Sequence, residues 1–187
     1  PGVRRARIQL WNRQALNDKV YGGKFKISLD SFSPNSSYYP KGEPVAYDPG
    51  AAKKILAAKN LKLKVLLNSP EAERWVGLYQ NDAAKAGVTL EIEKVMDEAQ
   101  WWQLVNSGKF ELVAYDGSFS EKPHPSVWHS KGAYNSSGIN DAQLDKVLDQ
   151  LESEFDLKKR ARLQQKAIAR LREFASEIPG LFSENSH

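Results

Sequence analysis

Two histidines, His124 and His129, stand five positions apart in a stretch, residues 115–139, that has neither a helical nor a strand period. Their spacing could suit a metal ion, but no carboxylate–histidine motif accompanies them, so polar loop residues are the simpler interpretation. The stretch also holds Trp128 and Tyr134. Aromatic and polar side chains together suit a small-ligand site, and they equally suit a loop packed by its own side chains. Connections of this length are usually functional or disordered.

Four carboxylates, Asp97, Glu98, Asp116 and Glu121, lie near the ends of predicted strands. Two of them could flank a substrate as acid and base. Asp97, however, is better explained as a helix cap, and no sequence feature selects a catalytic pair. The chain also lacks a glycine-rich nucleotide-binding motif, a P-loop and a nucleophile elbow. We therefore expect a protein that is not an enzyme and that uses no cofactor.

The composition narrows the chemistry further. The 187 residues include no cysteine, which excludes disulfides, thiol catalysis and cysteine-based zinc sites. No apolar run approaches the ~20 residues of a membrane-spanning helix. The net charge is +4, and part of the basic excess falls in residues 158–172. That stretch also carries an apolar stripe, so it predicts a solvated amphipathic helix rather than a nucleic-acid surface.

The first two thirds of the chain predict the elements that would position these residues. A helical pattern over 3–20 breaks at Asn12, and an extended surface segment follows over 24–47. Capping residues and alternating apolar positions then predict an order of β-α-β-α-β with short connections. That order favours a parallel or mixed sheet with helices packed on it. The expected strands cover 61–67, 88–93 and 110–115, and the expected helices begin after Asp48, Ser69 and Asp97.

After the long loop, Asn140 and Gln143 are expected to cap a helix. Its predicted apolar face consists of Leu144, Val147, Leu148, Leu151 and Phe155. The basic helix follows, with an apolar stripe that starts at Leu157. A short apolar stretch at 178–182 predicts a final strand.

Several stretches match, in order, the pattern of a known family. They are Val3–Gly23; Tyr-Asp-Pro-Gly-Ala-Ala-Lys-Lys-Ile-Leu at 47–56; Ala-Gly-Val-Thr-Leu-Glu at 86–91; Ser-Gly-Lys-Phe-Glu-Leu at 107–112; and the Asn135–Leu148 run. Together they resemble one lobe of the family 5 extracellular solute-binding proteins, the oligopeptide-, dipeptide- and nickel-binding components of ABC importers.

This resemblance implies an α/β fold with a mixed sheet flanked by helices, as in a periplasmic-binding-protein lobe of type II in the peptide-binding cluster. Residues 1–187 would then be a single solute-binding lobe, excised from a longer two-lobed protein. The implied partners are a peptide-like small solute, the missing N-terminal lobe and the membrane permease of an ABC importer, with no nucleic acid. The implied location is periplasmic or extracellular and membrane-associated, with any signal peptide outside this fragment.

The resemblance also assigns a role to the long loop. In the family this loop enters the cleft between lobes, and peptide binders place a carboxylate there for the ammonium group of the ligand. Glu121 falls at the carboxylate position, Ser118 replaces a tryptophan, and His124-Pro125 replaces Asp-Pro. A desolvated ammonium needs such a charge partner. The expected ligand-binding residues are Asp116, Gly117, Ser118, Phe119, Glu121, His124, Trp128, Tyr134 and Asn135.

Two alternatives remain open from the sequence. Related nickel-binding members use a histidine from this loop, so His124 is also consistent with a receptor for nickel or a metal complex. The same lobe could also serve as the sensor of a cytoplasmic, solute-responsive transcription regulator.

Overall fold

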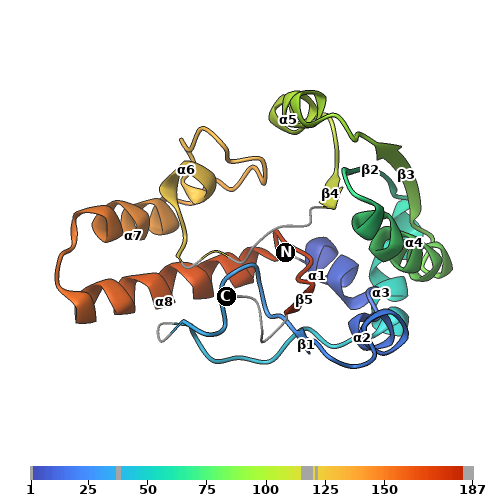
Figure 1. Ribbon diagram of the computed structural model, residues 1–187, viewed down its shortest axis with the longest axis horizontal. Coiled ribbons are helices and arrows are strands. Elements are labelled where there is room, and N and C mark those ends of the chain that lie inside the picture. The colour runs from blue at the N-terminus through green and yellow to red at the C-terminus, as the bar shows by residue number, and fades with distance from the viewer. Residues whose placement is uncertain (1, 37–38, 115–119, 121, 183–187) are drawn as a thin grey trace. The chain divides into compact units, whose positions relative to one another are not determined.

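The computed structural model describes residues 2–36, 39–114, 120 and 122–182 (Figure 1). The chain packs as two compact units. The sheet unit contains residues 2–27, 45–118 and 180–187, and the helical unit contains residues 28–44 and 119–179.

The sheet unit is built on three parallel strands in the order β3-β2-β4. They are β2 (Lys62–Leu67), β3 (Thr89–Lys94) and β4 (Leu112–Ala114). Helix α4 (Pro70–Lys85) connects β2 to β3, and α5 (Glu98–Ser107) connects β3 to β4. The register pairs Lys62 with Thr89 and Val65 with Leu112. The predicted β-α-β-α-β order and its sheet flanked by helices are confirmed.

One face of α5 supplies part of the core of the sheet unit. Trp101 is buried and packs with Leu66, Val95 and Val105, whereas Trp102 is 44% exposed. Adjacent residues on a helix cannot share one face, so this division follows directly from the pair of tryptophans.

The helices of the sheet unit are α1 (Gly2–Gln9), α2 (Arg13–Tyr21), α3 (Pro49–Leu56) with a 3-10 turn over Ala57–Lys59, and the α4 and α5 helices. Four of them, α2 to α5, begin after a side chain that accepts a backbone hydrogen bond. Ser69 caps α4 by accepting from Ala72 N at 3.0 Å, and Asp97 caps α5 by accepting from Gln100 N at 2.7 Å. Asn12 and Asp48 cap α2 and α3 in the same way. All four caps agree with the sequence prediction, because a cap depends only on neighbouring residues.

A second, two-stranded sheet joins distant parts of the sheet unit. Strand β1 (Lys26–Ile27) pairs antiparallel with β5 (Leu181–Phe182). The apolar stretch predicted as a final strand therefore returns to residues early in the chain.

The helical unit consists of the one-turn helix α6 (Pro125–Trp128), α7 (Ala142–Ser153) and α8 (Leu157–Phe174). Figure 1 shows α7 and α8 side by side as an antiparallel hairpin. Its core is formed by Phe32, Trp128, Ile139, Leu144, Leu148, Ala167, Ile168 and Leu171.

Three expectations about the helical unit are wrong. Asp141, not Asn140, caps α7 by accepting from Leu144 N at 2.7 Å. Phe155 and Leu157 are 90% and 71% exposed, because α7 ends at Ser153 and the apolar stripes do not continue through the turn.

The stretch over 24–47 is not simply a surface segment, since it contributes to the core of the helical unit. Phe32 is fully buried against Trp128, and the Asp30 carboxylate is buried beside Arg172 of α8. In the described part of the chain, no helix combines the length and the apolar character needed to cross a membrane.

Candidate functional site

The candidate site is the connection between β4 and α7. Five of its predicted ligand-binding residues, Asp116, Gly117, Ser118, Phe119 and Glu121, lie outside the described residues. Ser120, which stands among them, pairs with the 28–44 segment. Its N–H donates to Ser31 O at 2.9 Å, and its carbonyl accepts from Ser33 N at 2.9 Å.

Helix α6 follows, and it is a single turn. Pro125 occupies its first turn, and the His124 carbonyl accepts hydrogen bonds from Val127 N and Trp128 N, both at 3.0 Å. The imidazole of His124 is exposed and makes no capping bond. The rest of 122–141 is turns and irregular backbone, so among the described residues 122–130 the helix is limited to the single turn of α6.

The side chain of Trp128 packs the loop against the core of the helical unit. This side chain is only 8% exposed, and its ring lies 6.1 Å from that of Phe32 between ring centroids. It belongs to the core cluster that includes Leu144 and Leu148 of α7. The indole is therefore a packing element of the loop and is almost entirely shielded from solvent.

Asn135 closes the second half of the loop. Its Nδ2 donates to Ile139 O at 2.8 Å, and its Oδ1 accepts from Ile139 N at 3.2 Å and from Ser137 Oγ at 3.0 Å. The neighbouring Tyr134 side chain is 59% exposed, while its backbone N–H donates to Ser126 O at 2.8 Å. The loop thus fixes its own backbone and leaves the phenol of Tyr134 outside.

A polar cluster that the sequence analysis missed fastens the loop to α7. Ser130 donates to Asp145 through both its backbone N–H, at 2.8 Å, and its hydroxyl. The His129 ring lies 3.7 Å from Asp145 Oδ1 through Nδ1 and 3.5 Å from Asp149 Oδ1 through Nε2. Lys131 N donates to His129 Nδ1 at 3.0 Å. The spacing of Asp145 and Asp149 on one helical face was the available signal.

The electrostatics of the cluster fit this fastening role. Burial raises the pKa of Asp145, but hydrogen bonds from Ser130 and the nearby His129 lower it, and the net pKa lies below its ordinary value. In the part of the chain that the structure describes, no three histidine and carboxylate side chains gather closely enough to hold a metal ion. The arrangement can therefore present exposed polar groups, His124 and Tyr134, from a loop held by Trp128 and Asn135.

Known proteins match the chain both in sequence and in fold. The model of a family described as bacterial extracellular solute-binding proteins, family 5 middle, matches residues 1–138. The nickel-binding protein NikA of Staphylococcus aureus is 25% identical over 173 residues, which cover 84% of this chain and 34% of NikA.

Solved structures extend the likeness of the fold to nearly the whole chain. The crystal structure of Staphylococcus aureus NikA in complex with Ni(L-His)2 covers 97% of this chain with a TM-score of 0.83 and 21% identity. The oligopeptide-binding protein AppA of Bacillus subtilis, in complex with a nonapeptide, covers 97% with a TM-score of 0.84 and 18% identity. This chain spans only 42% and 41% of those two proteins.

Proposed function

This chain belongs to the bacterial extracellular solute-binding proteins of family 5, and on that premise we propose that it is a ligand-binding lobe that captures a small, peptide-like solute for an ABC importer. The observation that supports this most is the family match over residues 1–138, which includes the strand and much of the loop that would meet the solute. The relatives are solute-binding proteins and not enzymes, in agreement with the missing catalytic motifs.

We propose further that the lobe works as part of a longer protein. The chain spans 34% of NikA from Staphylococcus aureus, so a second lobe would come from the rest of the same polypeptide. Two lobes that close by a hinge would bury the solute, and the closed form would dock on a membrane permease. The protein would act in the periplasm or outside the cell, close to the membrane.

In this proposal Glu121 is the main ionic contact for the solute. A carboxylate that receives a desolvated ammonium gains a charge-assisted hydrogen bond, which is stronger than a neutral one. The neighbouring residues Asp116 to Phe119 would line the solute backbone. His124 and Tyr134 support the idea because both are exposed on the same loop. Trp128 and Asn135 would act mainly by fixing that loop.

A metal complex is the second candidate solute. Two observations favour it: the identity to a nickel-binding protein and the exposed imidazole of His124. A single histidine could complete the coordination of a metal ion already held by small ligands, since imidazole suits nickel. His124 would then take the role that Glu121 has for a peptide.

Native mass spectrometry of the full-length protein distinguishes the candidates. The protein is incubated with a mixture of short peptides and, separately, with nickel and L-histidine. We expect peptide adducts that are lost in Glu121→Gln and kept in Glu152→Gln, an exposed carboxylate of α7. Nickel–histidine adducts that depend on His124 would favour the metal complex. Absence of both kinds of adduct would contradict solute capture.

A further inference from the structure

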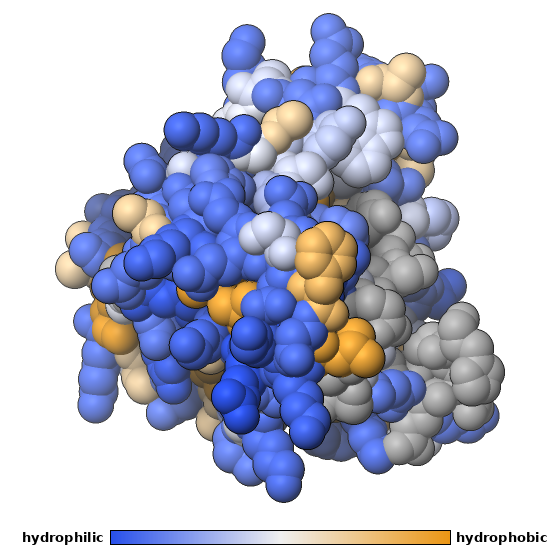
Figure 2. Space-filling view, turned by 90° about the vertical axis from the view of Figure 1, so that its left-hand side faces the viewer, coloured by the Kyte–Doolittle hydropathy of each residue, from blue (hydrophilic) through white to orange (hydrophobic). Residues whose placement is uncertain are grey.

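The turn between α7 and α8 presents two large apolar side chains to solvent. Phe155 is 90% exposed and Leu157 is 71% exposed, the highest values among the large apolar residues that the structure describes. Figure 2 looks onto the side of the molecule where this hairpin ends, and it shows a small group of apolar atoms among hydrophilic ones. Single exposed apolar residues are normal, but two together at the apex of a hairpin suggest a contact surface.

The turn holds these side chains outward because its polar groups are engaged with the backbone. Asp156 Oδ1 accepts from Lys159 N at 2.9 Å and so caps α8, and Glu154 Oε1 accepts from Asp156 N at 2.9 Å. Arg160 Nη1 donates to the carbonyls of Leu151, at 3.0 Å, and Glu154, at 2.7 Å. These hydrogen bonds fix the backbone of the turn at the end of α7 and at the start of α8. Phe155 and Leu157 are therefore exposed on a turn whose backbone is held in place.

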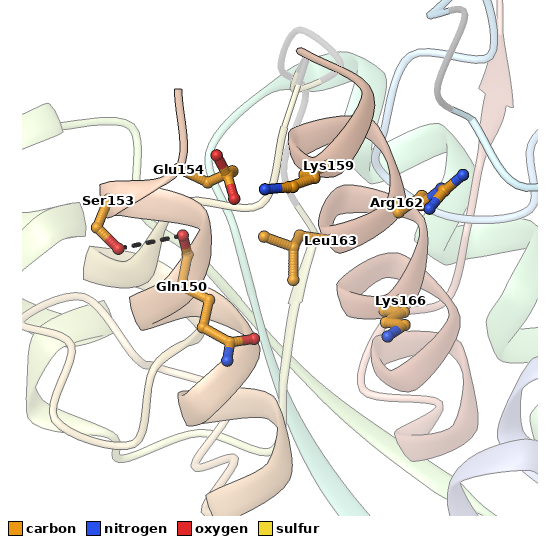
Figure 3. A pocket seen from close by; sticks show the side chains of 7 residues that line it. All are labelled: Gln150, Ser153, Glu154, Lys159, Arg162, Leu163 and Lys166. Carbon is orange, nitrogen blue, oxygen red and sulfur yellow. Dashed lines mark hydrogen bonds between the residues drawn. The ribbon is translucent and has the colours of Figure 1, made fainter. Parts of the chain in front are cut away.

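Four cations accompany the apolar pair on the first turns of α8. Lys158, Lys159, Arg162 and Lys166 are all exposed, and within the described part of the chain none of them lies in an ion pair. Three of them line an open, polar groove of about 360 Å³ between α7 and α8 (Figure 3). There Lys159 points toward Glu154, whereas Arg162 points away from α7.

The balance of charge at this end of the hairpin is therefore positive on its outer face. Two of its carboxylates, on Glu154 and Asp156, receive backbone hydrogen bonds. Glu152 is a further exposed carboxylate on the last turn of α7. Four exposed cations thus stand beside two exposed carboxylates, on Glu152 and Asp156, and two exposed apolar side chains.

We propose that this hairpin tip, defined as Phe155, Leu157, Lys158, Lys159, Arg162 and Lys166, contacts an anionic lipid bilayer. Protruding apolar side chains can enter the interface of a bilayer without a preformed pocket, and the cations meet the phosphates of the headgroups. A second copy of the chain is a poorer occupant, because each copy carries a net charge of +4. The tip would place a solute-binding protein against the membrane surface.

Vesicle sedimentation with the full-length, unlipidated protein tests this proposal. We expect binding to vesicles of equal parts phosphatidylglycerol and phosphatidylcholine, and little binding to phosphatidylcholine alone. The double variant Phe155→Ser/Leu157→Ser should bind at least about tenfold more weakly, since two apolar side chains leave the interface. Binding of the unaltered protein should weaken between about 0.05 M and 0.5 M salt, because salt screens the attraction between the cations and the headgroups. Lys158→Glu/Lys159→Glu should lose most of this salt-sensitive part of the binding.

Matched controls lie on α3 of the sheet unit. Ile55→Ser removes another exposed apolar side chain, and Lys53→Glu/Lys54→Glu reverses another exposed pair of cations. Both should leave vesicle binding unchanged. Circular dichroism shows that each variant is folded, and unchanged solute adducts keep this test separate from that of solute capture.

Three outcomes would overturn the proposal. One is the absence of binding to anionic vesicles by the unaltered protein. Another is equal binding by the Phe155→Ser/Leu157→Ser variant. The third is a dimer in analytical ultracentrifugation that this variant abolishes while vesicle binding stays the same, because the tip would then be an interface between copies.

Discussion

Arg172 of α8 donates a hydrogen bond from Nε to Oδ2 of Asp30 at 2.6 Å, although 142 positions separate them. The same guanidinium donates to Pro40 O at 2.9 Å and lies 4.8 Å from the centre of the Tyr39 ring. Oδ1 of Asp30 accepts from Phe32 N at 2.9 Å. This ion pair therefore ties the 28–44 segment to α8 next to the core of the helical unit.

Arg172→Ala should destabilise the helical unit. It would leave the buried Asp30 carboxylate without its charge partner, and breaking such a pair costs on the order of 3 kcal/mol. Urea denaturation followed by tryptophan fluorescence measures the free energy of unfolding. Arg162→Ala on the same helix is the control and should change it by less than about 0.5 kcal/mol. Equal effects of the two substitutions would show that the Asp30–Arg172 pair adds nothing.

Glu177 should make stability depend on pH. Burial raises its pKa to about 6 from an ordinary value of 4.5, with a smaller contribution from Asp30, while hydrogen bonds from Ser31 oppose the rise. Because the folded pKa is the higher one, this contribution to stability is complete below about pH 4.5 and is lost as the pH rises through about 6. The loss amounts to at most about 2 kcal/mol.

The Glu177→Gln variant isolates this effect, since glutamine does not titrate. The difference in unfolding free energy, variant minus unaltered protein, should increase between about pH 4.5 and pH 7. Denaturation curves at several pH values measure that difference. A difference that stays flat or decreases with pH would mean that folding does not raise the pKa of the Glu177 carboxyl group.

Gly132 should not tolerate a side chain. A Cβ atom at this position would lie 2.5 Å from Ser126 O and 2.6 Å from Pro125 O, both backbone atoms of α6. Gly132→Ala should therefore displace the loop and speed hydrogen exchange of the Tyr134 amide, which donates to Ser126 O. Gly77→Ala in α4 is the matched control, since its Cβ meets nothing within 4 Å, and it should be neutral or stabilise by up to about 1 kcal/mol. Unchanged exchange in Gly132→Ala would count against the close approach.

The isolated 187-residue chain should fold but bind solute poorly. Buried Trp101 and Trp128 should give a near-ultraviolet circular dichroism signal that is lost on heating. A receptor buries most of its ligand between two lobes, so one lobe alone should bind roughly a thousandfold more weakly than the whole protein. Absence of the near-ultraviolet signal, or equal affinity of chain and whole protein, would contradict this expectation.

The sequence alone predicts the features of this fold that depend on neighbouring residues. The caps Asn12, Asp48, Ser69 and Asp97 and the β-α-β-α-β order of elements belong to this group, because both caps and alternating strands are local patterns. At α7 the cap is Asp141 instead of the predicted Asn140, because both neighbouring side chains are of types that cap helices and the sequence does not distinguish them. The periodic pattern places Phe155 on the apolar face of α7, because periodicity does not reveal where a helix ends.

Features that depend on contacts between residues far apart along the chain are not predicted from the sequence. The burial of Asp30 and Phe32 arises from α8 and Trp128, more than ninety positions away along the chain in each case. The same holds for the candidate site. The sequence does not show which of the loop aromatics Trp128 and Tyr134 is buried. The packing of the loop on α7 buries Trp128 and leaves Tyr134 exposed.

Isothermal titration calorimetry of the full-length protein tests solute capture by the loop most directly. The titrant is a peptide recovered as an adduct by native mass spectrometry, and the proteins are the unaltered form, Glu121→Gln and Glu152→Gln. We predict an unchanged Kd for Glu152→Gln and a Kd weaker by on the order of a hundredfold for Glu121→Gln, which loses the charge partner of the ammonium. Equal Kd values for Glu121→Gln and the unaltered protein would contradict the role of this loop in holding the solute.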